Sequence, residues 1–131
     1  MEIRAITLND YERLIDFWRK NYFVNEMDNF ERFKLFLEKN PNLSVLCEDK
    51  EKIIGTALGS FDGRRGYLQK VVTDKTNRKK GVGKQIILEV IKRLRSLSVL
   101  YIPISCEEEN VGFYEKCGFK KTKQIPMNMN L

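Results

Sequence analysis

The sequence predicts a single α/β (α+β) domain over residues 1–131, and three observations lead to this fold class. Residues 68–95 have the pattern of a strand, a turn and an amphipathic helix. The apolar run 99–104 follows that helix, as expected of a buried strand that forms a parallel, right-handed unit with the first. Residues 52–61 form a further strand, joined to the first by the glycine-containing turn 62–66.

The other elements follow from local patterns along the chain. Apolar residues at helical spacing predict two early helices, and the second ends at Asn40 because Pro41 disfavours a helical residue before it. Acidic residues open a short later helix, where they complement its dipole. These elements are strands 2–6 and 43–48, helices 9–21, 28–39 and 107–116, and two strands in the tail 118–131 around Ile125 and Pro126.

Composition narrows the possible chemistry. With 131 residues and 42% hydrophobic residues, the chain can bury one core. The absence of histidine removes a histidine base, a Ser-His or Cys-His pair and any histidine-containing zinc site. Three cysteines, Cys47, Cys106 and Cys117, lack metal-ligand spacing, so no metal is expected. Without an apolar leader or a run of membrane-spanning length, a cytoplasmic setting is expected, with no membrane partner.

A basic, glycine-containing turn joins strand 68–73 to the following helix. The net charge of +6 favours an acidic partner, either a phosphorylated cofactor or nucleic acid. Gly81 and Gly83 allow backbone N–H groups to approach an anion, and the first helical turn presents such groups unpaired. The turn consists of Arg78, Lys79, Lys80, Gly81, Val82, Gly83 and Lys84. Taken alone, these residues could equally form a solvated start of a helix that binds no anion.

Two well-known phosphate motifs do not fit this turn. A Walker loop needs a first glycine where Arg78 stands and Ser or Thr where Gln85 follows Lys84. The dinucleotide fingerprint needs a third glycine where Ile86 stands. What does match is Arg/Gln-x-x-Gly-x-Gly/Ala over residues 78–83, and here the sequence resembles the GCN5-related N-acetyltransferase (GNAT) superfamily, in which this turn binds the pyrophosphate of acetyl-coenzyme A.

A second segment strengthens the resemblance. Residues 110–119, Asn-Val-Gly-Phe-Tyr-Glu-Lys-Cys-Gly-Phe, resemble the segment that ends the cofactor-binding core of GNAT enzymes. Asn110 and Tyr114 are one helical turn apart, so both can face the same groove. Their short spacing is closest to that of glucosamine 6-phosphate N-acetyltransferases.

The resemblance implies a fold, a reaction and a cofactor site. The fold would be a mixed, mostly antiparallel sheet whose central parallel pair splays apart, with helices on both faces. The reaction would be acetyl transfer from acetyl-coenzyme A, as co-substrate, to a primary amine. The cofactor-binding residues would be the backbone of Val71, Val72 and Thr73, then Arg78, Lys79, Lys80, Gly81, Val82, Gly83 and Lys84, and Asn110.

Tyr114 is the expected catalytic residue. Its phenol, with an ordinary pKa of about 10, can donate a proton to the departing sulfur. Without the surrounding motif, Tyr114 would be interpreted as an aromatic residue packed in the core. Its position in the motif favours the catalytic role. Related enzymes place a glutamate where this chain has Gln69, which cannot accept a proton. A water chain, a backbone carbonyl or an acid such as Glu107 could substitute for it. Glu107 is therefore a second catalytic candidate, although acids at helix starts usually serve as caps.

In the family, the first two helices and their link form the acceptor site. This makes Trp18, Tyr22 and Phe23 candidate substrate-binding residues, although aromatic residues at helical spacing usually belong to the core. Gln69, on the strand before the basic turn, is a further candidate. The sequence leaves the acceptor open among amino sugars, polyamines, amino acids, aminoglycosides and protein N-termini. Two alternatives remain open: a non-catalytic acyl-CoA sensor and the less favoured nucleic-acid-binding module. An exposed strand edge would allow a homodimer.

Overall fold

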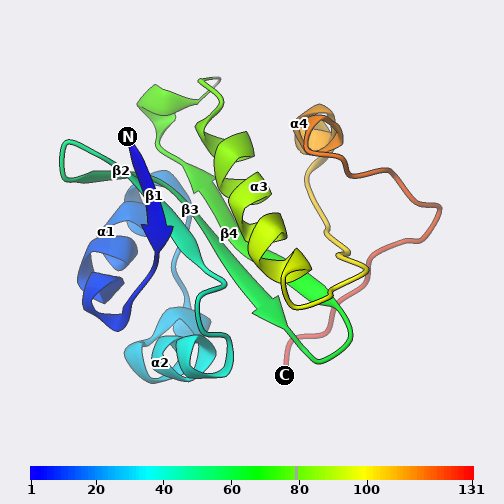
Figure 1. Cartoon of the computed structure of the whole chain (residues 1–131), viewed down its shortest axis with the longest axis horizontal. Coiled ribbons are helices and arrows are strands. Elements are labelled where there is room, and N and C mark those ends of the chain that lie inside the picture. Colours follow the sequence, from blue (N-terminus) through cyan, green and yellow to red (C-terminus); the bar gives the residue numbers. More distant parts are fainter. Residues whose placement is uncertain (79) are drawn as a thin grey trace.

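The structure is a computed structural model that describes residues 1–78 and 80–131. Along the first three quarters of the chain, one strand is followed by two helices, then by three consecutive strands and a long helix (Figure 1). The strands are β1 (Glu2–Ala5), β2 (Val45–Asp49), β3 (Lys52–Phe61) and β4 (Gly66–Thr73). The α-helices are α1 (Tyr11–Asn21), α2 (Phe30–Lys39), α3 (Val82–Arg95) and α4 (Val111–Lys116). Short 3₁₀ turns are η1 (Leu8–Asp10), η2 (Glu26–Asp28), η3 (Lys75–Asn77) and η4 (Glu108–Asn110).

Within the described residues, the strands form one sheet in the order β1-β2-β3-β4, and each pairing is antiparallel. The long strands β3 and β4 are joined by the turn at Asp62, whose carboxylate accepts the N–H groups of Arg64 and Arg65 at 2.7 Å each. Residues 52–61 therefore form the strand that the sequence predicts. The outer edge of β4 faces the segment that follows α3, where the N–H of Gly66 donates to the carbonyl of Tyr101.

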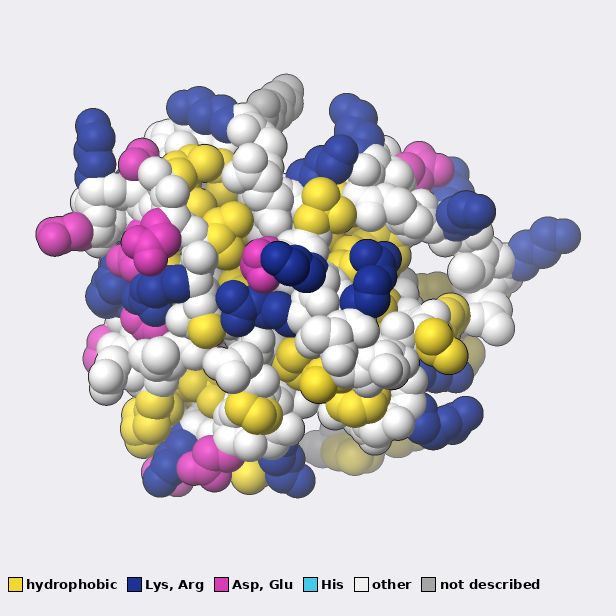
Figure 2. Space-filling view, viewed as in Figure 1, with side chains coloured by type: hydrophobic (Ala, Val, Ile, Leu, Met, Phe, Trp, Pro, Cys, Tyr) yellow, Lys and Arg dark blue, Asp and Glu magenta, His cyan; other side chains and the backbone are white. Residues whose placement is uncertain are grey.

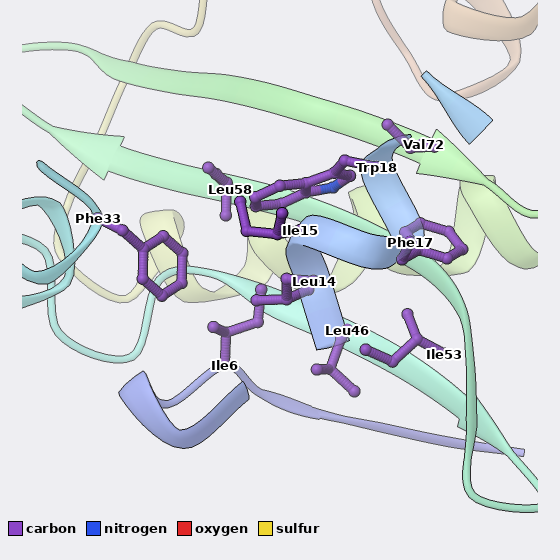
Figure 3. Packing of buried hydrophobic residues seen from close by; sticks show 10 residues of the cluster. All are labelled: Ile6, Leu14, Ile15, Phe17, Trp18, Phe33, Leu46, Ile53, Leu58 and Val72. Atoms are coloured by element: carbon purple, nitrogen blue, oxygen red, sulfur yellow. The ribbon is translucent and has the colours of Figure 1, made fainter. Parts of the chain in front are cut away.

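The sheet is covered on both faces, each by its own apolar cluster. Side chains alternate across a strand, so Leu46 of β2 faces α1 and α2 while Val45 and Cys47 face α3. Figure 1 shows α1 and α2 on the opposite side of the strands from α3. Trp18 lies fully buried in the first cluster, beside Leu58 and Val72 (Figure 3). The expected α/β class, with helices on both faces, is confirmed.

The prediction of a strand at residues 99–104 is wrong. These residues are all described, and they are assigned to no strand. The N–H of Gly66 donates to the carbonyl of Tyr101 at 3.0 Å. A single hydrogen bond of this kind does not make a strand pairing. Pro103 has no N–H to donate, and Leu100 is 95% exposed rather than buried. The parallel, splayed pair is therefore not confirmed, although the segment does lie along β4.

The last elements also differ from expectation. The predicted helix 107–116 divides into η4 and α4. The tail 118–131, predicted to hold two strands, is extended and is assigned none among the described residues. Most of its apolar side chains lie in solvent, for example Ile125 and Met127. A strand needs partner strands to satisfy its backbone groups, and no described segment supplies them here.

Candidate active site

A β-bulge interrupts β4 beside Val71, Val72 and Thr73, the residues whose backbone was expected to bind the cofactor. Thr56 of β3 pairs with Val72 and Leu58 pairs with Gln69, so Lys70 and Val71 together oppose one residue. Lys70 has a φ of 49°, the left-handed conformation found in many bulges. A bulge breaks the ladder locally and re-aims the backbone. Val71, Val72 and Thr73 follow it directly and lead to the basic turn.

A short 3₁₀ turn, η3, connects the end of β4 to the basic turn. The carboxylate of Asp74 caps it, accepting the Thr76 hydroxyl at 2.6 Å and the Thr76 N–H at 2.8 Å. The hydroxyl bond is the main reason why the pKa of Asp74 falls to about 2, with Lys52, 3.4 Å away, contributing in the same direction. The Asp74 N–H also donates to the carbonyl of Ile54 at 2.8 Å. The chain therefore leaves the sheet in a fixed direction.

The basic turn ends on the beginning of α3. Gly81 is the N-cap residue with a φ of 81°, a conformation that glycine adopts without strain. The first N–H groups of a helix lack partners within it, and no side chain caps this end in the described part of the chain. Arg78, Lys80 and Lys84 are exposed around it, whereas Lys79 lies outside the described residues. The geometry suits a bound phosphate group.

Three elements meet at Gly83, in the first turn of α3. A Cβ on this residue would lie 3.0 Å from Cζ of Phe113 and 3.1 Å from Oγ1 of Thr73. The first turn of α3, the end of β4 and α4 are thus in close contact, and Figure 1 shows α4 beside the beginning of α3. Sequence motifs about 30 residues apart therefore come together in the fold.

An open pocket of about 620 Å³ lies beside the bulge. The link between α1 and α2 (residues 22–29) and α2 itself form one wall, and β4 forms another. Ser105 and Tyr114 border it from the C-terminal part of the chain. The residues used below are Tyr22, Phe23, Asp28, Arg32, Lys39, Gln69, Lys70, Val71 and Tyr114, all of which line the pocket.

The predicted proton donor, Tyr114, is half-buried at this pocket. Its ring packs edge-on against Phe113 and Phe119, with centroids 5.1 and 5.9 Å apart. Burial raises the pKa of Tyr114 to about 12, and Cys106 and Cys117 act in the same direction. The hydroxyl therefore keeps its proton at neutral pH and can donate it.

The other predicted site residues divide between the pocket and its surroundings. Tyr22, Phe23 and Gln69 line the pocket, as expected of substrate-binding residues. Trp18 instead lies in the core, where its Nε1 donates to the Thr56 hydroxyl at 3.0 Å, so it cannot contact a substrate in the pocket. Glu107 is exposed and is not among the described residues that line the pocket.

Asn110, the predicted cofactor contact, is exposed as the N-cap residue of α4. It lies one helical turn before Tyr114, but it does not line the pocket in the described structure. Its helix, α4, lies beside the first turn of α3, because Phe113 packs against Gly83.

Two charged pocket residues were missed by sequence reasoning. Lys70 and Asp28 form an ion pair at 3.0 Å with side chains only 9% and 10% exposed. The two residues are 42 positions apart, so no local pattern brings them together. The one available signal was the position of Lys70 between Gln69 and the expected cofactor-binding residue Val71.

Basic side chains are spread over the face seen in Figure 2, among acidic and apolar groups. This distribution offers no continuous basic stripe on that face for a nucleic-acid backbone to follow. The described part of the chain contains no helix that is both apolar and long enough to cross a membrane. Among the same residues, no group of three or more Cys, Asp and Glu side chains is placed to hold a metal ion.

The end of β4 therefore lies beside a helix N-terminus that suits a phosphate group, and β4 also borders a pocket that a tyrosine lines. The sequence profile of the Acetyltransferase (GNAT) family matches residues 11–119. The chain therefore belongs to the GNAT family of acetyltransferases, which confirms the resemblance and the enzyme class drawn from the sequence. This family uses acetyl-coenzyme A.

Individual relatives agree with this assignment. A glucosamine 6-phosphate N-acetyltransferase of Schizosaccharomyces pombe is 33% identical over 86 residues, covering 59% of this chain and 78% of the relative. An acetyltransferase of Pectobacterium atrosepticum is 25% identical over 135 residues, covering 100% of this chain and 96% of its own length.

Solved structures share the fold. The glucosamine-6-phosphate N-acetyltransferase of Arabidopsis thaliana superposes with a TM-score of 0.77 at 24% identity, covering 98% of this chain and 97% of that one. The PaiA N-acetyltransferase of Thermoplasma acidophilum, solved in complex with coenzyme A, superposes with a TM-score of 0.79 at 18% identity, covering 95% and 92%.

Proposed function

We propose that this protein transfers the acetyl group of acetyl-coenzyme A to a primary amine, by direct attack of the amine on the thioester. The observation that carries the proposal is the contact of Gly83 with Phe113 and Thr73, because it joins the anion-binding turn, the bulged strand and the helix of Tyr114. In this arrangement, the N–H groups at the start of α3 and the side chains of Arg78, Lys80 and Lys84 bind the diphosphate. Lys79 and Asn110 are proposed as further contacts.

The chain's own groups then divide the work of the transfer. Backbone N–H groups at the bulge, near Val71 to Thr73, polarise the thioester carbonyl and stabilise the oxyanion that forms on it. Tyr114 protonates the departing sulfur, consistent with a pKa high enough to keep its proton. Gln69 cannot serve as a base, so the amine proton must leave through water, which can pass it to a carboxylate outside the pocket such as Glu107.

The charge of the pocket indicates which kind of amine it could accept. Arg32 and Lys39 line it from one side of α2, and neither makes an ion pair with another described residue. Since Asp28 and Lys70 balance each other, the pocket carries an excess of positive charge, which suits an amine that also carries an anionic group. An amino sugar phosphate such as glucosamine 6-phosphate, the compound in the name of one relative, is the first such amine to test.

The experiment is a screen that follows release of free thiol from acetyl-coenzyme A with amines of several classes. Glucosamine 6-phosphate should be compared with glucosamine, which lacks the phosphate, and with a polyamine, an amino acid, an aminoglycoside and a short peptide. Transfer to any of these amines supports the proposal. Binding of coenzyme A without transfer to any amine would favour the acyl-CoA sensor, which the missing carboxylate at Gln69 keeps open.

A further inference from the structure

The ammonium group of Lys70 is enclosed by the wall of the pocket. Its Nζ donates to the carbonyl of Phe23 at 2.7 Å and to Oδ2 of Asp28 at 3.0 Å. Three aromatic rings complete the enclosure, with centroids 4.4 Å from Nζ for Phe23, 5.1 Å for Trp18 and 5.4 Å for Tyr22. Hydrogen bonds and cation–π contacts therefore attach this ammonium to the end of α1 and to the link that follows it.

The backbone of the same residue forms the bulge. Lys70 adopts a left-handed conformation, which is unfavourable for a residue with a side chain unless its surroundings fix it. Its carbonyl accepts the Thr56 hydroxyl at 2.8 Å, and that hydroxyl accepts the indole N–H of Trp18 at 3.0 Å. One residue thus shapes β4 with its backbone and holds the link with its side chain.

Stability alone does not require a charged group here. A buried ion pair is often replaced by apolar residues without loss of stability, and an apolar side chain would fill a space lined by three rings. Unlike an apolar side chain, an ammonium makes directional hydrogen bonds. It therefore fixes the carbonyl of Phe23 and the carboxylate of Asp28 at hydrogen-bonding distance. Tyr22, Phe23 and Asp28 all line the pocket, so fixing them fixes its wall.

We propose that Lys70 is a positioning residue for acetyl transfer, whose ammonium holds the acceptor wall (residues 22–28) against the bulge that faces the thioester. The inference rests on the proposed function, because it takes the pocket as the acceptor site. Lys70 touches neither the reacting carbonyl nor the sulfur in this role. It sets the distance between the two walls that hold the reacting groups, so its loss should impair use of the acceptor and leave coenzyme binding intact.

The test replaces Lys70→Met together with Asp28→Asn. Methionine has a similar length without the charge, and asparagine removes the unpaired carboxylate charge while keeping an oxygen to accept the Asn25 N–H, now bound at 3.0 Å. Lys70→Arg preserves the charge. Lys20→Met is the matched control, because it breaks an exposed Lys–Asp pair of the same 3.0 Å length on α1.

Kinetics would use acetyl-coenzyme A and the best amine of the screen, starting with glucosamine 6-phosphate. The double variant should lose at least about tenfold in kcat/KM for the amine, as expected when charge-assisted hydrogen bonds are lost. Its affinity for coenzyme A should stay within about twofold of wild type, and Lys70→Arg should recover part of the loss. A folded double variant with kcat/KM within about twofold of wild type would overturn the proposal.

A second readout needs no turnover. Trp18 is the single tryptophan and is fully buried under the wall, so acrylamide should quench its fluorescence poorly in wild type. Increased quenching in the double variant, with an unchanged far-ultraviolet spectrum and an unchanged Lys20→Met control, would show that Lys70 holds the wall. Unchanged quenching would refute this role. If wild type binds coenzyme A but acetylates no amine, the proposed function fails, and quenching alone still decides whether Lys70 fixes the wall.

Discussion

The ring of Phe113 lies directly against the backbone of Gly83, so closely that an added Cβ would come within 3.0 Å of Cζ. This contact brings the helix that carries Tyr114 to the beginning of α3. In the proposed function, the diphosphate site and the proton donor Tyr114 then hold the two ends of the pantetheine arm of the coenzyme.

Replacing Gly83→Ala should disturb this contact. The new methyl group must displace Phe113 or Thr73, which offsets the gain of up to about 1 kcal/mol that alanine brings to a helix interior. We expect a melting temperature at or below that of wild type and an affinity for coenzyme A reduced by about tenfold. Gly112→Ala is the control, because no described atom lies within 4 Å of its added Cβ. Equal effects of the two variants would contradict the proposed packing role.

Arg78→Ala should weaken coenzyme A binding by about ten- to a hundredfold, the effect of losing one charge-assisted contact of roughly 1.5–3 kcal/mol. Titration calorimetry at fixed ionic strength would measure it. Arg95→Ala removes the same charge from the other end of α3 and should leave the affinity nearly unchanged. If both variants bind alike, Arg78 does not contact the diphosphate.

Tyr114→Phe should lower kcat by about a hundredfold, in the range of general acid catalysis, while coenzyme A affinity changes little. Because burial raises the pKa of Tyr114 to about 12, its hydroxyl stays protonated throughout pH 6–10. We therefore expect no fall in kcat from its ionisation in that range. Tyr67→Phe, which removes an exposed hydroxyl at the β3–β4 turn, is the control. A Tyr114 variant with wild-type turnover would remove the proposed donor.

Asp74 should make stability depend on pH. Its pKa is lowered to about 2 in the folded protein, so its contribution is fully present above the unfolded pKa near 3.9 and is lost as pH falls through about 2. The total is about 2–3 kcal/mol, of which roughly half should be lost by pH 3. Urea unfolding between pH 6 and pH 3 should show a shallower loss for Asp74→Asn than for wild type. Parallel curves for the two proteins would be the contrary result.

The sequence predicts the elements whose pattern is local. Strand β3 begins at Lys52 and ends at Phe61 as expected, and α3 carries its apolar stripe on the buried face, because hydrophobic periodicity directly reflects which side is covered. The glycine-containing turn before α3 was also predictable, because Gly81 adopts a positive φ there, a local requirement. The close packing of Phe113 and Thr73 around Gly83 was not, because Phe113 is distant in the sequence.

What the sequence could not supply depends on distant partners. An apolar run such as 99–104 becomes a strand only where a neighbouring edge accepts its hydrogen bonds, and that edge is not encoded locally. Trp18 was expected in the substrate site because it lies on the correct helix, but its indole N–H finds Thr56 in the core. The pairing of Asp28 with Lys70 likewise arises only when the sheet brings their elements together.

The account depends most on where the coenzyme binds, and a crystal structure with bound coenzyme A tests this directly. We expect the diphosphate at the N–H groups that begin α3, beside Arg78, and the sulfur within hydrogen-bonding distance of the Tyr114 hydroxyl, next to the bulge at Lys70 and Val71. Electron density for the diphosphate away from this helix start, or for the sulfur on another side of the sheet, would contradict it.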